Sequence, residues 1–301
     1  MSLSIRSLLF ALILTTFPVL GFAQIVIGTH EDVDFESPEG WAMAFMTASS
    51  LNLGQLPPQS TEFGDVSFSA ELGSIPRLDR EQQQVGFGGF KHEDLNKSPA
   101  FGRVRASLGL IWDVTAEVSW TPPLEINGAK PDDLWGLALS RPLLGGDNWG
   151  LGMRVFALQG AVIADVTCDK DIASLPPSSP GNLFGCLAPS DDRLEMDHYG
   201  AELTLSFHEF PLGLQPWVSL ASSRMDPYVE VNALLNGAID FSTVDSNGTT
   251  ETFNAGIAYQ LRENWRLNFG ASYTPLKVDR PNNPGDDDDY WSVKLGLTWD
   301  L

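Results

Sequence analysis

The segment Tyr-Trp-Ser-Val-Lys-Leu-Gly-Leu-Thr-Trp-Asp-Leu, residues 290–301, alternates strictly between apolar and polar side chains. The odd positions carry the apolar set Trp291, Val293, Leu295, Leu297, Trp299 and Leu301. The even positions from 292 to 300 carry polar or small residues, among them Lys294. A period of two indicates a β-strand with one apolar face and one polar face, because successive side chains point to opposite sides.

The same alternation recurs along the chain. It is clear at 102–120, 196–208, 251–261 and 265–273, and weaker at 41–53, 65–73, 84–91, 133–140, 149–164 and 213–223. Segment 102–120 is longer than one membrane-crossing strand of about 9–11 residues. It therefore predicts a hairpin that turns near Ile111–Asp113.

Aromatic residues lie eight positions apart on the apolar face of four predicted strands. The pairs are Trp112/Trp120, Tyr199/Phe207, Trp265/Tyr273 and Trp291/Trp299. Eight residues span roughly 26 Å along a strand, or roughly 20 Å along a membrane normal when the strand is tilted. Aromatic rings at both ends of an apolar band are typical of the two membrane–water interfaces, whereas a soluble β-sandwich would place them mid-face.

A chain that ends within such a strand resembles the outer-membrane β-barrel proteins of Gram-negative bacteria, in which the last strand closes the barrel. The family usually ends on Phe or Trp, and this chain ends on Leu301. The resemblance implies an all-β fold, a transmembrane antiparallel up-and-down β-barrel, in the outer membrane of a Gram-negative bacterium. The expected partners are membrane lipid, lipopolysaccharide and the barrel insertion machinery.

The connections sort into short and long sets that nearly alternate, as in barrels with short periplasmic turns and long outer loops. This pattern predicts twelve strands with both termini in the periplasm. Asn236-Gly237 is a strong hairpin signal between 228–235 and 238–244. We interpret those arms as an outer hairpin; if they join the wall instead, the barrel has fourteen strands.

The N-terminal region has the pattern of a cleavable secretory signal. Arg6 is followed by an apolar run from Leu8 to Leu20 and by Gly21-Phe22-Ala23, with small residues at the cleavage positions. We therefore expect a signal peptide at 1–23, a periplasmic or lumen-entering segment at 24–40, and the barrel at 41–301.

The chain is strongly acidic, with a net charge of −21. This balance argues against nucleic acid as a partner, because binding of nucleic acid would require basic patches.

Cys168 and Cys186 lie in a segment rich in Pro, Ser and Gly. In an exported protein this pair predicts a disulfide bond, with two free thiols as the alternative.

Charged residues on the predicted inner face are the candidates for lumen chemistry. They are Arg103, Arg105, Glu117, Arg154, Glu202, Arg266 and Lys294, and Arg105 is expected beside Glu117. They either form ion pairs that stabilise the inner wall or line a constriction that selects solutes.

The most consistent function is a narrow passive channel or transporter for small solutes, without enzymatic activity or cofactor. The alternatives are a structural or adhesive barrel and a barrel-embedded hydrolase. No site for a metal ion is predicted. Asp286, Asp287, Asp288 and Asp289 are only a weak candidate for a divalent cation, because their spacing matches no defined calcium loop.

Overall fold

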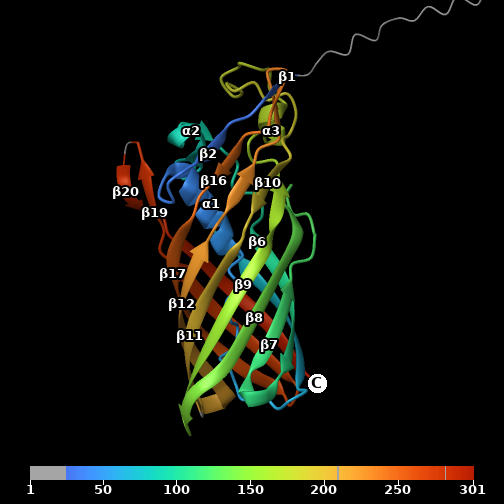
Figure 1. Ribbon diagram of the computed structural model, residues 1–301, viewed down its shortest axis with the longest axis vertical. Coiled ribbons are helices and arrows are strands. Elements are labelled where there is room, and N and C mark those ends of the chain that lie inside the picture. Colours follow the sequence, from blue (N-terminus) through green and yellow to red (C-terminus); the bar gives the residue numbers. More distant parts are fainter. Residues whose placement is uncertain (1–24, 209, 282) are drawn as a thin grey trace, which may run out of the picture.

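The computed structural model describes residues 25–208, 210–281 and 283–301; the predicted signal peptide lies outside the described residues. Within these ranges, ten antiparallel strands form a closed ring (Figure 1). The tenth pairs with the first, so the wall has no free edge. In ring order the strands are β3 (Val66–Ser74), β6 (Ala100–Gly109), β7 (Thr115–Trp120), β8 (Lys130–Gly146), β9 (Trp149–Ala164), β11 (His198–Phe207), β12 (Leu214–Met225), β17 (Gly248–Arg262), β18 (Trp265–Thr274) and β21 (Tyr290–Asp300).

The wall alternates as the sequence predicts. Along β21, Leu295 is 47% exposed on the outside, whereas Ser292 is 3% exposed on the inside. β18 pairs with β21 in register from Trp265↔Trp299 to Thr274↔Tyr290, so the apolar faces of the two strands coincide. The described part of the chain has no helix long and apolar enough to cross a membrane.

Short connections lie at one end of the ring, which we call the turn end, and long ones at the other, the loop end (Figure 1). The turn end carries η1 (Ile111–Asp113) and η2 (Pro211–Gly213). The chain reverses at η1, within the hairpin predicted for 102–120.

Small elements cover the loop end. They are β1 (Ile25–Ile27), β2 (His30–Asp32), β4 (Gln84–Val85), α2 (Gly86–Gly89), β5 (Lys91–His92), α3 (Lys170–Ala173), β10 (Asp192–Glu195), β13 (Tyr228–Glu230), β14 (Ala233–Leu235), β15 (Ala238–Asp240), β16 (Thr243–Asp245), β19 (Lys277–Arg280) and β20 (Asn283–Asp287). β10 extends the wall by pairing with β9, and β13, β16 and β2 follow in that order. β1 pairs in parallel with β15.

The helix α1 (Pro38–Ser49) is packed inside the loop end of the barrel (Figure 1). Ser37 caps it by accepting a hydrogen bond from the Gly40 N–H, and Pro38 occupies its first turn, a favoured helix start. Trp41 and Phe45 are fully buried, and Phe45 packs edge-to-face on Tyr290 of β21. The main hydrophobic core therefore joins the helix to the inner wall.

The predicted strand numbers, twelve or fourteen, are not confirmed, because the ring closes with ten. Segment 41–53 was expected to be a strand, but it forms most of α1 and then enters the lumen. Segment 84–91 forms only β4, α2 and the start of β5, because Phe87, Gly88 and Gly89 adopt left-handed backbone conformations that interrupt a strand.

The predicted outer hairpin exists, but as part of the loop-end cover. β14 and β15 flank the Asn236-Gly237 turn, and β13 pairs with β10 and β16.

The prediction that both termini lie at the same end is wrong for the described chain. Ile25 pairs with β15 at the loop end, whereas Leu301 lies at the turn end (Figure 1). The chain crosses from one end of the barrel to the other ten times in the wall and once through the lumen. Because this number of crossings is odd, the chain begins and ends at opposite ends of the barrel.

Candidate functional site

Residues 50–59, here called the plug segment, run from the end of α1 through the lumen toward the turn end. Its residues contact inward-facing side chains from most of the ring. Asn52 forms a hydrogen bond with His198 on β11. Gln55 forms one with Glu71 on β3, and Gln59 forms one with Arg266 on β18. The bore of this barrel is therefore filled by its own chain.

Asn52 is the most extensively bonded residue of the plug segment. Its side-chain oxygen accepts hydrogen bonds from Arg103 and Arg105, each at 3.1 Å. Its N–H donates to Nε2 of His198 at 3.1 Å, and its carbonyl accepts from Arg154. A fully bonded amide at this depth fixes the segment in one position, because unpaired buried polar groups are costly.

The arginines that hold Asn52 are themselves held by carboxylates on the wall. Arg105 lies 2.7 Å from Glu71 and 2.6 Å from Glu117, and Arg154 lies 2.6 Å from the same Glu117 oxygen. The amino group of Lys294 is 3.8 Å from Glu71. Removing one partner of such a buried pair costs about 3–5 kcal/mol.

The other predicted inner-wall residues also contact the plug segment. Arg103 donates to the carbonyls of Ser50 and Leu51. Glu202 accepts from the N–H of Gly54 at 2.7 Å. Arg266 donates to Gln59 at 2.8 Å and pairs with Asp300.

The histidine of this network has no free ring nitrogen. Nδ1 of His198 lies 2.9 Å from the Met196 carbonyl, so it donates there, and Nε2 accepts from Asn52. A ring bonded at both nitrogens within the wall positions the plug segment and is not placed to act as a catalytic base.

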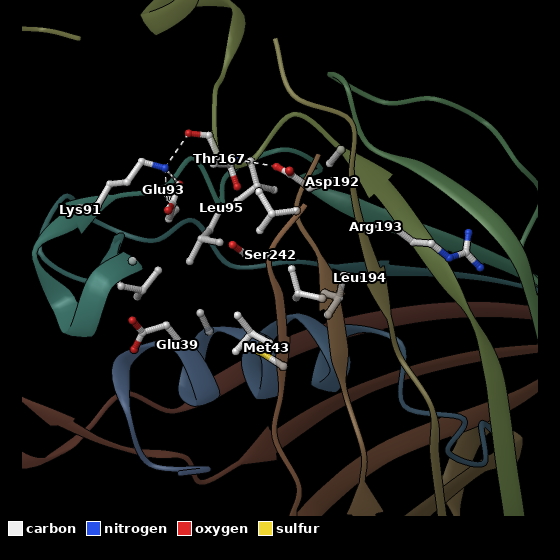
Figure 2. Close-up of a pocket in the computed structure, with 18 of the residues that line it drawn as sticks. Glu39, Met43, Lys91, Glu93, Leu95, Thr167, Asp192, Arg193, Leu194 and Ser242 are labelled. Carbon is white, nitrogen blue, oxygen red and sulfur yellow. Dashed lines mark hydrogen bonds and ion pairs between the residues drawn. The ribbon is translucent and has the colours of Figure 1, made fainter. Parts of the chain in front are cut away.

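A second feature is a partly open cavity of about 210 Å³ at the loop end (Figure 2). Ala42, Met43 and Met46 of α1 form one side, and Val229 of β13 and Val244 of β16 form another. The remaining apolar lining comes from Val85, Phe87, Leu95, Ala129, Val162, Ala164, Val166, Phe184, Leu194, Val231 and Leu235.

A buried ion pair between Lys91 and Glu93 forms part of the polar lining of this cavity (Figure 2). The Lys91 ammonium donates to both oxygens of Glu93 at 2.8 Å and to the carbonyl of Thr167 at 2.7 Å. Burial raises the pKa of Glu93 to about 7, although the Lys91 ammonium acts against this shift. Glu93 is therefore poised between its two protonation states near neutral pH.

The disulfide prediction is confirmed. Cys168 and Cys186 are bonded, and they pack against Ala233 below the loop that contains α3.

The carboxylates of the weak cation candidate 286–289 form other contacts. Asp286 and Asp288 pair with Arg280, and Asp289 accepts a hydrogen bond from the Tyr273 hydroxyl at 2.8 Å. Within the described ranges, no group of three His, Cys, Asp or Glu side chains is placed to hold a metal ion.

The eight predicted girdle aromatics lie near the two ends of the wall. Trp265 stacks on Trp299 at the turn end, and Tyr273 packs on Trp291 at the loop end. Trp112 and Phe207 belong to the turn end and Trp120 and Tyr199 to the loop end.

Sequence reasoning missed Glu71, Asn52, the plug segment, Lys91 and Glu93. The Ser37-Pro38 start of α1 is a recognisable helix signal. It could have shown that residues following position 41 are not a wall strand.

A closed ring of antiparallel strands with an exposed apolar outer face and a polar inner face is the architecture of a transmembrane β-barrel. No protein-family description matches the sequence, and no curated protein matches it.

Solved structures similar to this chain include an outer-membrane channel, an outer-membrane protease and an attachment invasion locus protein. An outer-membrane channel from Pseudomonas putida F1 has 9% identity and a TM-score of 0.44, covering 83% of this chain and 100% of the other. The outer membrane protease OmpT from Escherichia coli has 11% identity and a TM-score of 0.39, covering 79% and 94%. Ail, the attachment invasion locus protein of Yersinia pestis, has 10% identity and a TM-score of 0.33, covering 80% and 100%.

Proposed function

We propose that the protein is an outer-membrane channel for small solutes whose bore is closed by the plug segment. The observation that carries this proposal is the kind of contact that fills the lumen. Arg103, Arg105 and Arg154 all donate to a separate, extended part of the chain, mostly to its carbonyls. A barrel of about eight strands can fill its interior with wall side chains alone, whereas the interior of this ten-strand ring is filled by a separate segment of the chain.

The contacts that close the bore are hydrogen bonds from wall side chains and not a packed hydrophobic core. The wall groups that bind the plug segment are charged, and water can solvate them when the segment moves. The same groups then line a narrow bore containing both signs of charge. The proposal includes no catalytic activity and no cofactor, and its partners are membrane lipid and small solutes.

A cross-link between plug and wall tests this directly. A Cβ atom added to Gly152 would lie 2.7 Å from Cβ of Pro58, so Pro58→Cys/Gly152→Cys requires a shift of only about 1 Å to reach disulfide geometry. We expect the oxidised variant to be closed in single-channel recordings and to recover wild-type openings after reduction. Mass spectrometry must first show that Cys168–Cys186 is intact.

A second variant should open the bore. Asn52→Ala removes the side chain that Arg103 and Arg105 hold, so the open fraction should rise relative to wild type. Asn264→Ala, at an exposed turn, is the matched control. Absence of conductance in wild type and Asn52→Ala alike would favour a structural or adhesive barrel, and equal conductance of the locked and wild-type proteins would refute closure by residues 50–59.

A further inference from the structure

We propose that the loop-end cavity binds a small, neutral, mostly apolar molecule with one or two aromatic rings and a hydroxyl group that hydrogen-bonds to Glu93. This binding site goes beyond the proposed channel and does not depend on it, because no residue of the plug segment lines the cavity.

The size and lining of the cavity limit the ligand first. An apolar cavity of about 150 Å³ remains dry and is able to bind benzene. The present cavity measures about 210 Å³, and its sides are formed by Met43, Leu95, Val231 and similar residues. It therefore has room for one or two rings and disfavours a strongly hydrated solute.

Glu93 supplies the polar contact. All three protons of the Lys91 ammonium have acceptors, two on Glu93 and one on Thr167. Asp192, also at the cavity, is occupied by the N–H groups of Thr167 and Asn232 and by the Ser190 hydroxyl. Among the described residues only Lys91 donates to the Glu93 carboxylate, which leaves acceptor positions for a donor from the ligand.

The charges around the cavity favour a neutral ligand. A cation that reached Glu93 would meet the Lys91 ammonium, 2.8 Å from the same carboxylate. An anion would meet Glu93 together with Asp192 and Glu39, which also line the space. The lining cations Lys97 and Arg193 are already paired with carboxylates. A hydroxyl group can donate to Glu93 without carrying a charge of either sign.

Two aromatic rings mark the rim of the cavity. Phe87 and Phe184 stack with centroids 5.3 Å apart and an angle of 19° between their planes. Both line the cavity, yet Phe87 is 63% exposed, so this pair faces both the cavity and the solvent. Phe87 has φ of 53°, a conformation that is rare for a bulky residue and often associated with ligand clamps.

The experiment uses 1-naphthol as the probe and the full protein in lipid nanodiscs. Equilibrium dialysis measures binding, and empty nanodiscs correct for partition into lipid. Naphthalene, 1-naphthoate and 1-naphthylmethylamine are compared with it. We expect 1-naphthol to bind about tenfold more tightly than naphthalene and more tightly than either charged analogue.

Two variants assign this binding to the cavity. Met43→Trp should fill the space and abolish binding, whereas Leu137→Trp on the exposed outer wall should not. Lys91→Met/Glu93→Leu removes both charges together, and should lower 1-naphthol affinity about tenfold, to that of naphthalene. Resistance to heat in detergent electrophoresis verifies that each variant has an intact barrel.

Several outcomes would overturn the proposal. Unchanged 1-naphthol binding by Met43→Trp would place the ligand elsewhere, and equal or tighter binding of a charged analogue would refute the neutral class. Absence of all binding would refute the site. The oxidised Pro58→Cys/Gly152→Cys protein should bind 1-naphthol like wild type, so a failure of the channel proposal and a failure of this one are distinguishable.

Discussion

The Gly54 N–H donates to Oε2 of Glu202 at 2.7 Å, while Oε1 of the same carboxylate accepts from the Ser219 hydroxyl at 2.6 Å. One wall carboxylate on β11 thus connects the plug segment to β12. The contact is made to backbone, so it restrains the path of the segment whatever side chains the segment carries.

Glu202→Ala should increase the mobility of the plug segment without unfolding the barrel. A hydrogen bond to a charged group contributes about 1.5–3 kcal/mol, so the Gly54 amide should exchange its hydrogen roughly ten- to a hundredfold faster. Hydrogen exchange with mass spectrometry measures this, with Glu125→Ala in an exposed loop as the control. Unchanged exchange across residues 50–59 would mean that Glu202 does not hold the segment.

Leu295→Arg should impair insertion. Leu295 lies on the outer face of β21 midway between Trp291 and Trp299. A charge at the bilayer midplane costs about 2–4 kcal/mol, whereas Lys294→Ala changes only the inner face and should have a smaller effect. The yield of folded barrel inserted into lipid vesicles measures the effect of each of these two substitutions. Equal yields of Leu295→Arg and wild type would contradict the outward assignment of odd positions in this strand.

Reduction of Cys168–Cys186 should free a loop and leave the barrel intact. A disulfide that closes a loop of this length stabilises it by about 3 kcal/mol in the chain-entropy account. The closed wall is held by hydrogen bonds between strands. Trypsin should therefore cleave at Lys170 faster after reduction, with no loss of strand circular dichroism. Cys168→Ser/Cys186→Ser should behave like the reduced protein, and loss of strand signal in it would contradict this separation.

The loop-end structure around Glu93 should become less stable as the pH rises from about 4.5 to about 7. The pKa of Glu93 is raised from 4.5 to about 7, chiefly by burial, with Asp192 and Glu39 adding repulsion and Lys91 opposing it. Below pH 4.5 the carboxyl is protonated in both folded and unfolded states and has no effect. In the window the folded state holds a proton that the unfolded state releases, so stability falls by up to about 3 kcal/mol.

Glu93→Gln should flatten this pH dependence, and Glu81→Gln, at an exposed position, should preserve it. Hydrogen exchange of residues 84–97 between pH 4 and pH 8, corrected for intrinsic rates, provides the measurement. Protection of these amides that increases with pH in the wild type would contradict the predicted direction.

The sequence predicts the strands of the barrel wall better than the segment that fills the lumen. Alternation along 265–273 and 290–301 is a local property, and it identifies strands whatever lies inside the ring. The disulfide follows from two cysteines in one loop of an exported chain. The plug segment has no such signal, because Asn52 finds its partners on Arg103 and His198, far away in the sequence.

The cavity could not be predicted for the same reason. Its lining comes from α1, from residues 85–97, from β9 and β10, and from β13 to β16. Each of these segments contributes a few apolar residues that have no regular spacing with respect to the others. Only the arrangement of the loops brings Lys91 and Glu93 to the wall of that space.

The passage of residues 50–59 through a closed ring also constrains the order of biogenesis. β3, which follows the plug segment, is the strand with which β21 finally pairs. If the ring closed before residues 50–59 lay along its inner face, the N-terminal portion, including the folded α1, would have to pass through a narrow tube. Closure of the ring around a segment that is already in place avoids this. Substitution of Arg103 or Asn52, which hold the segment against the wall, should therefore slow assembly of the barrel as well as change its permeability.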